Sequence, residues 1–121
     1  TNNEIGVAGD YCIHCSNCDF SEFTGNITNG AEYGIRATDS YYVTIESNVI
    51  EGFKEYGIYF QNSPYSKVNY NHLVGADAGE FKRAIHNSSS NQYAEVNYNH
   101  LELLSSQHEH YVNQYGIEVQ D

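Results

Sequence analysis

At 121 residues, the chain has the length of one domain, which we assign to residues 1–121. Its formal net charge is −11, and this acidic excess argues against nucleic acid or an anionic membrane as a partner. No apolar run approaches the roughly 20 residues of a membrane-spanning helix, so the sequence predicts no membrane insertion.

Two short motifs alternate along the chain. The first is Ile/Val-x-x-Asn-x-Ile/Leu, found at residues 45–50, 68–73 and 96–101, with a degenerate copy that we align at residues 15–20. The second is Tyr-Gly-Ile, found at residues 33–35, 56–58 and 115–117, with weaker copies at 83–85 and 5–7. The segment from the second motif to the first has a nearly constant length, whereas the return segment varies. This pattern indicates a solenoid whose loops vary on one side of the coil.

The repeats are predicted to be β-strands. Apolar and polar residues alternate in segments such as 33–37 and 43–45, and this period of two is typical of half-buried strands. The asparagines of the first motif, Asn48, Asn71 and Asn99, fit tight corners because Asn tolerates a left-handed backbone. Stacked about 4.8 Å apart, their side chains are predicted to form a ladder of amide hydrogen bonds.

These motifs resemble the right-handed parallel β-helix repeat of carbohydrate-binding proteins and sugar hydrolases. The resemblance extends from about residue 4 to residue 119 and depends on the Gly-Ile strand and the Asn corner. It implies an all-β fold, a right-handed parallel β-helix of about four rungs and a partial fifth, where a rung is one turn of the coil. Pectate lyases and archaeal surface proteins such as disaggregatases have similar rungs, so the resemblance is specific for fold and weak for function.

The first rung, predicted from Ile5 to about Phe23, contains three closely spaced cysteines. In our alignment Cys15 takes a core position and Cys18 takes the place of the ladder asparagine. We therefore favour cysteines that pack as small apolar side chains. An iron–sulfur or zinc site and a disulfide remain as alternatives, and Cys12 makes the number of thiols odd.

The middle of the chain contains the most regular rungs, predicted at residues 33–53 and 56–74. A turn-rich loop at residues 23–31 precedes them. The triplets that begin at Asn26 and Asn87 match the N-glycosylation pattern, which arises readily by chance in a chain this rich in asparagine.

Longer loops, at residues 75–83 and 103–114, are predicted to leave the coil on one side. Because the isoleucines of the Gly-Ile strands point inward, the residues after them form an outward row beside these loops: Arg36, Tyr59, His86 and Glu118. The resemblance to β-helix lyases places a substrate groove on this kind of face. We assign substrate binding to Arg36, Tyr59 and His86, and candidate acid/base catalysis to His86, Glu118 and Tyr59. The alternative is an ordinary solvated face.

Metal ligands are sparse in this interpretation. His72 and His100 follow ladder asparagines and are predicted to stack outward, but two imidazoles make a poor transition-metal site. The segment 108–110, His-Glu-His, is a weak chelator in a loop. No carboxylate cluster on adjacent rungs provides a calcium site. We therefore predict no metal site and no cofactor, with calcium left open.

Two functions of different classes remain. The domain either binds or degrades polysaccharide, as a lyase or glycoside hydrolase if it is an enzyme, or it is a structural solenoid that stacks into a fibre or surface stalk. An acidic chain repels acidic polysaccharide, which weighs against a lyase. Neither end shows a cap, so we expect a fragment of a longer β-helix. We predict a secreted or cell-surface location, with polysaccharide or other copies of the chain at the end rungs as partners.

Overall fold

The computed structural model describes residues 4–5, 10–30, 32–75, 83–88, 93–102, 109–113 and 118–119, with side chains in residues 10–30, 32–75, 83–87 and 93–102. Within this part of the chain all regular structure is β-strand, and there is no helix long and apolar enough to cross a membrane. The strands are β1 (Glu4–Ile5), β2 (Tyr11–Ser16), β3 (Glu22–Thr24), β4 (Ile27–Asn29), β5 (Tyr33–Thr38), β6 (Thr44–Glu46), β7 (Val49–Phe53), β8 (Tyr56–Gln61), β9 (Lys67–Asn69), β10 (His72–Gly75), β11 (Arg83–Ser88), β12 (Glu95–Asn97), β13 (His100–Glu102), β14 (Glu109–Asn113) and β15 (Glu118–Val119).

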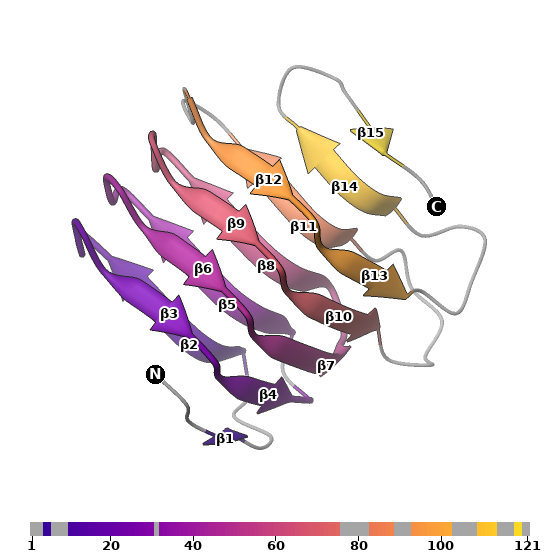
Figure 1. Cartoon of the computed structure of the whole chain (residues 1–121). Coiled ribbons are helices and arrows are strands. Elements are labelled where there is room, and N and C mark those ends of the chain that lie inside the picture. The colour runs from indigo at the N-terminus through magenta and orange to yellow at the C-terminus, as the bar shows by residue number, and fades with distance from the viewer. Residues whose placement is uncertain are drawn as a thin grey trace.

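Three sheets are stacked along one coil axis (Figure 1). Sheet A contains β1, β4, β7, β10 and β13; sheet B contains β2, β5, β8, β11, β14 and β15; sheet C contains β3, β6, β9 and β12. Each rung adds one strand to each sheet, so the first rung is β2–β3–β4, the second β5–β6–β7, the third β8–β9–β10 and the fourth β11–β12–β13. Pairing is parallel except between β14 and β15. The prediction of an all-β parallel β-helix is confirmed.

The interior consists of columns to which each rung adds a similar apolar side chain. In sheet B, Ile35, Ile58 and Ile85 are in register and fully buried. The other sheets are built in the same way, with Ile45 and Val68 in sheet C and Ile50 and Leu73 in sheet A. Burial stabilises the fold by about 1.5–3 kcal/mol for each such side chain. A thin core is therefore sufficient to hold the coil.

Close packing explains the glycine of the Tyr-Gly-Ile motif. A Cβ atom at Gly57 would lie 2.5 Å from the carbonyl oxygen of Ala84 and 2.5 Å from Cδ2 of Leu73. Gly34 is similarly confined, by Ile50 and by the carbonyl of Gly57. The motif therefore marks the place where a sheet B strand starts close against sheet A.

An asparagine ladder occupies the corner between sheets C and A. The backbone N and Nδ2 of Asn48 donate to Oδ1 of Asn71 at 3.0 and 2.9 Å, and those of Asn71 donate to Oδ1 of Asn99 at 2.9 and 3.0 Å. Asn71 Nδ2 also donates to the Ile45 carbonyl at 2.9 Å. Asn48 and Asn71 are each 1% exposed, so the ladder satisfies polar groups that water does not reach.

The left-handed residue at this corner is the one before each asparagine. Its φ is 57° at Ser47, 58° at Tyr70 and 57° at Tyr98. The prediction that the asparagines themselves adopt this conformation is therefore wrong. The preceding residue makes the turn, and this leaves the asparagine side chain directed into the coil.

The ladder begins one rung earlier than predicted, at Asn26 and not at Asn48. The backbone N and Nδ2 of Asn26 donate to Oδ1 of Asn48 at 2.9 and 3.0 Å. In sheet C it is Phe23, not Cys15, that pairs with Ile45. The alignment of residues 15–20 with the asparagine motif is therefore wrong. Both predicted glycosylation acceptors, Asn26 and Asn87, have buried side chains.

The first copy of the Tyr-Gly-Ile motif is also displaced. Tyr11 pairs with Tyr33, and Ile13 pairs with Ile35, so Tyr-Cys-Ile at residues 11–13 takes this place in the first rung. Ile5, which we assigned to this motif, belongs to sheet A, where it pairs with Thr28. The predicted boundary of the first rung at Ile5 is wrong for the same reason.

Cys15 and Cys18 are joined in a disulfide across the turn after β2, with their Cα atoms 5.9 Å apart. Of the three alternatives left by the sequence, a disulfide is the one observed for this pair. Cys18 lies at a corner lined by serine in later rungs: its backbone N donates to Oγ of Ser40 at 2.9 Å, and the backbone N of Ser40 donates to Oγ of Ser63 at 3.4 Å.

The partial fifth rung is β14, within the predicted loop 103–114. In sheet B, β14 continues the parallel register, with Ile85 opposite Tyr111 and His86 opposite Val112. β15 returns antiparallel to it, and Glu118 pairs with Val112. The placement of Glu118 as the next residue after His86 in the outward row is therefore wrong.

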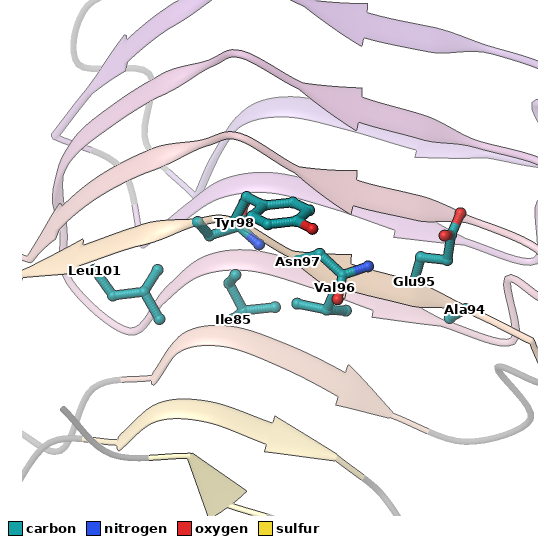
Figure 2. Close-up of a pocket in the computed structure, with 8 residues that line it drawn as sticks. Ile85, Ala94, Glu95, Val96, Asn97, Tyr98 and Leu101 are labelled. Carbon is teal, nitrogen blue, oxygen red and sulfur yellow. The ribbon is translucent and has the colours of Figure 1, made fainter.

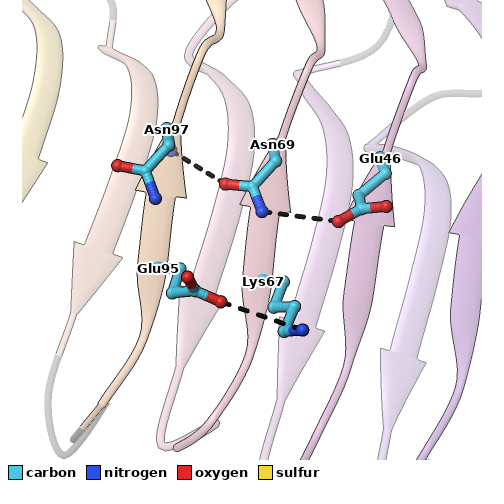
Figure 3. Close-up of polar contacts among 5 residues, drawn as sticks. All are labelled: Glu46, Lys67, Asn69, Glu95 and Asn97. Atoms are coloured by element: carbon cyan, nitrogen blue, oxygen red, sulfur yellow. Dashed lines mark hydrogen bonds and ion pairs between the residues drawn. The ribbon is translucent and has the colours of Figure 1, made fainter.

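The outer face of sheet C is a stack of polar residues (Figure 3). The backbone N of Asn97 donates to Oδ1 of Asn69 at 2.9 Å, and Asn69 Nδ2 donates to Oε1 of Glu46 at 3.4 Å. Lys67 Nζ lies 3.9 Å from Oε2 of Glu95, and both side chains are more than half exposed. Exposed ion pairs contribute about 0–1 kcal/mol. These contacts therefore link neighbouring rungs on a face that is otherwise largely exposed to solvent.

A cavity of about 500 Å³ lies in the fourth rung and is lined by the apolar Ile85, Ala94, Val96 and Leu101 and by the more polar Glu95, Asn97, Tyr98 and Asn99 (Figure 2). Ile85 is in register with Ile58, Val96 with Val68 and Leu101 with Leu73. The cavity is therefore the continuation of the apolar interior, and we do not assign a ligand to it.

Candidate functional site

The outer face of sheet B carries the predicted row of Arg36, Tyr59 and His86. Arg36 pairs with Tyr59, and Tyr59 pairs with His86, so the three residues occupy one register position in successive rungs. The row begins one rung earlier than predicted, because His14 pairs with Arg36. The Tyr59 and His86 rings are stacked with centroids 5.1 Å apart and planes 3° apart.

Arg36 is surrounded by aromatic rings. Its Cζ atom lies 5.4 Å from the ring centroid of Tyr11, 6.0 Å from that of Tyr33 and 5.5 Å from that of Tyr59. Its Nη1 also donates to Nε2 of His14 at 3.1 Å. Cation–π contacts contribute about 0.5–1 kcal/mol each at exposed sites. The guanidinium is therefore held in a fixed place on this face.

The tyrosines at the start of the sheet B strands complete this aromatic face. Tyr33 and Tyr56 are stacked with ring centroids 4.9 Å apart, and Tyr11 lies 5.1 Å from Tyr33 with its ring tilted. Burial raises the pKa of Tyr33 to about 12, and the carboxylate of Glu55 acts in the same direction. Arg83 Nη1 donates to the hydroxyl of Tyr56 at 3.1 Å. We did not predict these contacts, although the recurring tyrosine before each Gly-Ile was the available signal.

The outer face of sheet A brings together two histidines. His72 in β10 and His100 in β13 are Cα partners on adjacent rungs, and Leu73 and Leu101 alternate with them toward the core. The two imidazole centroids are 4.8 Å apart, with the rings edge to face. The predicted outward stacking of these two side chains is observed.

A third ligand-bearing side chain joins these histidines. Glu102 is two residues after His100 in the same strand, so both side chains lie on the same face. Its Oε1 accepts a hydrogen bond from Nε2 of His100 at 2.8 Å and lies 3.6 Å from Nε2 of His72. The hydrogen bond from His100 holds the pKa of the Glu102 carboxyl below its usual range, and the nearby charge of both imidazoles adds to this.

One atom of this cluster has an ion-pair partner, Glu102, but no hydrogen bond within the usual distance. His72 Nε2 is buried and makes no hydrogen bond, although about half of the His72 side chain is exposed. A buried ring nitrogen without a hydrogen bond is costly, because it has lost water and gained no hydrogen bond in return. One ligand atom from each of His72, His100 and Glu102 lies within 4.8 Å of the other two. The cluster therefore converges on a common point beside Glu102.

Residues 1–118 match the model of the family described as NosD, periplasmic copper-binding protein. The chain belongs to this family. Its members are of the right-handed parallel β-helix type, which agrees with the fold described above. The periplasmic description agrees with the predicted location outside the cytoplasm. No curated protein and no solved structure gave a significant match.

The donor set of the sheet A cluster fits a copper ion. Imidazole nitrogen is a preferred ligand of copper, and a carboxylate oxygen completes a set of three donors. Two donors bound about 2.0 Å from one ion lie at most about 4 Å apart, so the 4.8 Å spread needs only small side-chain movements. The prediction of no metal site was made without Glu102. Side chains alternate between the two faces of a strand, so the residue two positions after His100 is expected on the same face. This pattern was the signal in the sequence that identifies Glu102.

Proposed function

We propose that this β-helix binds a transition-metal ion, copper by the description of its family, between His72, His100 and Glu102. The observation that carries the proposal is the convergence of three ligand atoms: Nε2 of His72 and Nε2 of His100 lie 3.6 and 2.8 Å from the same carboxylate oxygen of Glu102. An imidazole whose ring nitrogen has given up its proton offers a lone pair to a metal ion, and the carboxylate offers its oxygens.

Each residue has a defined part in this site. The parallel register between β10 and β13 holds the two imidazoles one above the other, and Leu73 and Leu101 anchor the strands on the opposite face. Glu102 supplies negative charge and keeps it, because its pKa is lowered. Copper, when bound, supplies a Lewis-acidic and redox-active centre. The side chains of the cluster remain 46–67% exposed, so water has access to the site.

The proposal is tested by titrating Cu(II) into the chain and into the variants His72→Ala, His100→Ala and Glu102→Gln by isothermal calorimetry. Removing an outer-sphere partner alone weakens metal sites by about 10–100-fold, so each of these ligand substitutions should weaken binding at least about tenfold. Glu95→Gln on sheet C and His14→Ala on sheet B are matched controls that should bind as the wild type does.

The His-Glu-His segment at residues 108–110 provides the competing explanation. The double substitution His108→Ala, His110→Ala should leave the high-affinity binding in place. Loss of binding in that variant, together with unchanged binding in His72→Ala, would assign the copper to the segment instead and refute the proposal.

A second function, contact with polysaccharide along sheet B, is supported by the fixed position of Arg36 among three tyrosine rings. A planar guanidinium beside aromatic surfaces is suited to carboxylated sugars, with the guanidinium on the acid group and a ring against the sugar. The row repeats at the rung spacing of about 4.8 Å, with Arg36, Tyr59 and His86 in successive rungs. Side chains spaced in this way can contact successive parts of a linear polymer. We propose binding here and not catalysis, because Val112 occupies the position next to His86 and Glu118 lies one strand beyond it.

This second function is tested by titrating uronic-acid and neutral oligosaccharides against the wild type and a Tyr59→Ala, His86→Ala variant. Binding of the uronate series that is lost in the double variant supports it. Equal binding by both proteins, or no binding by either, would leave sheet B as a structural face.

A further inference from the structure

The donors of the sheet A cluster also distinguish between the two oxidation states of copper. We infer that the site holds Cu(II) and releases the ion when a one-electron reductant of the ascorbate class converts it to Cu(I). This inference rests on the proposed metal site and adds to it the charge state of the bound ion and the condition for its release.

The ligand atoms are two imidazole nitrogens and one carboxylate oxygen. Cu(I) is a soft ion that prefers thiolate and thioether sulfur, whereas imidazole and carboxylate suit the harder dication. The chain contains no methionine. Of its cysteines, Cys15 and Cys18 form a disulfide and Cys12 contacts the carbonyl of Asn29, all in the first rung. The site itself, between the third and fourth rungs, thus offers no sulfur ligand.

The charge around the site acts in the same direction. Glu102 contributes a carboxylate to the ligand set itself. Glu51 lies in the same column, because Val74 is in register with both Glu51 and Glu102, and the Cα atoms of the two glutamates are therefore about 10 Å apart. The whole chain carries −11. A negative potential attracts a dication about twice as strongly as a monocation. Reduction therefore removes part of the attraction that holds the ion.

The electrons of the proposed release step balance between the copper and the reductant. The reductant loses one electron, and Cu(II) gains it and becomes Cu(I). The imidazoles and the carboxylate give up the ion, and Nε2 of His100 takes up a proton from water, so that it again donates to Glu102 as in the metal-free structure.

The inference is tested by measuring both affinities of the full chain by competition with chelators, Cu(II) in air and Cu(I) under nitrogen. We expect the dissociation constant for Cu(II) to be at least about tenfold lower than that for Cu(I), a difference of about 1.4 kcal/mol. Adding ascorbate to the Cu(II)-loaded chain beside a Cu(I) chelator should then transfer the copper. Equal affinities, or tighter binding of Cu(I), would overturn the inference.

The variant Glu102→Gln provides the matched control, because it keeps both imidazoles and the side-chain shape and removes only the charge. It should weaken the binding of Cu(II) more than the binding of Cu(I), which narrows the ratio of the two dissociation constants. An unchanged circular dichroism spectrum should show that the chain remains folded. A ratio that does not change would contradict the selectivity argument. Failure of the metal site itself has a different result: neither ion binds, or His72→Ala binds both as the wild type does.

Discussion

The outer faces of sheets A and B are both built by stacking one residue per rung, but they differ in what the stacked groups offer to a ligand. On sheet B, Arg36 contacts three rings and His14, Tyr59 stacks on His86, and Arg83 bonds to Tyr56. On sheet A, Nε2 of His72 and Nε2 of His100 converge on one oxygen of Glu102, at 3.6 and 2.8 Å.

The comparison shows which features of the surface follow from the repeat alone and need no function to explain them. Any residue type that recurs at one position of the coil comes to lie above its copies, so stacking alone is weak evidence for a site. The convergence of three ligand atoms is stronger evidence, because Glu102 is not a copy of its register partner in the rung before, Val74. The predictions below test this contrast between the two faces.

The largest effect is expected in the fully paired interior ladder. Asn71→Ala removes the acceptor of two hydrogen bonds from Asn48 and the donor to Ile45. Each buried group left unpaired costs about 1–3 kcal/mol, so the variant should unfold at a clearly lower denaturant concentration. Asn97→Ala, which removes an exposed asparagine side chain and keeps the backbone bond to Asn69, should change the midpoint little. Equal midpoints for the two variants would refute the ladder as the source of stability.

A smaller loss is expected where the coil is most tightly packed. In Gly57→Ala the added Cβ meets the Ala84 carbonyl and Leu73 at 2.5 Å, so the rungs must move apart. Overpacking of this kind costs about 1–3 kcal/mol. Thermal or urea unfolding of the variant measures it, and a stability equal to that of the wild type would show that the coil adapts without strain.

The loss of a side chain should lower the free energy of unfolding more on sheet B than on sheet A. Tyr56→Phe removes the acceptor of the bond from Arg83 and should cost about 0.5–1.5 kcal/mol. His72→Ala removes a nitrogen that has no hydrogen bond, and in metal-free buffer it should cost less than about 0.5 kcal/mol. A larger cost for His72→Ala than for Tyr56→Phe would reverse the contrast between the faces.

The smallest effect is a pH dependence on sheet B. The pKa of Tyr33 is raised to about 12 in the folded chain, chiefly by burial, so the folded state retains its proton to higher pH than the unfolded state does. The stability from this group is present below about pH 10 and is lost as the pH rises through about 12. Tyr33→Phe should flatten the decline in stability above pH 10. The phenolate absorbance of the wild type minus that of the variant should titrate near 12, and a midpoint near 10 would contradict the assignment.

The sequence was sufficient for the fold and for the regular rungs, because the Gly-Ile strand and the asparagine corner recur there in recognisable form. The first rung was misaligned because Cys15 and Cys18 have the spacing of the apolar residue and the asparagine, while the true member, Asn26, lies in a segment with the composition of a loop. β14 was hidden for a related reason: its residues 109–113 do not contain the Tyr-Gly-Ile motif that the later segment 115–117 does.

The metal cluster was only half visible in the sequence. The stacking of His72 on His100 follows from the repeat, and Glu102 follows from alternation within one strand. The convergence of the two Nε2 atoms on Glu102, at 3.6 and 2.8 Å, depends on side-chain rotamers, which no sequence pattern reports. The same holds for Arg36, whose three ring contacts depend on how neighbouring rungs are offset.

The most direct measurement of the central claim is anomalous diffraction at the copper edge from crystals of the chain grown with Cu(II). The account predicts a strong anomalous peak within bonding distance of Nε2 of His72, Nε2 of His100 and a carboxylate oxygen of Glu102, and its absence in crystals of His72→Ala. A peak located elsewhere, or a peak between these residues that persists in the variant, would contradict the assignment of this face as the metal site.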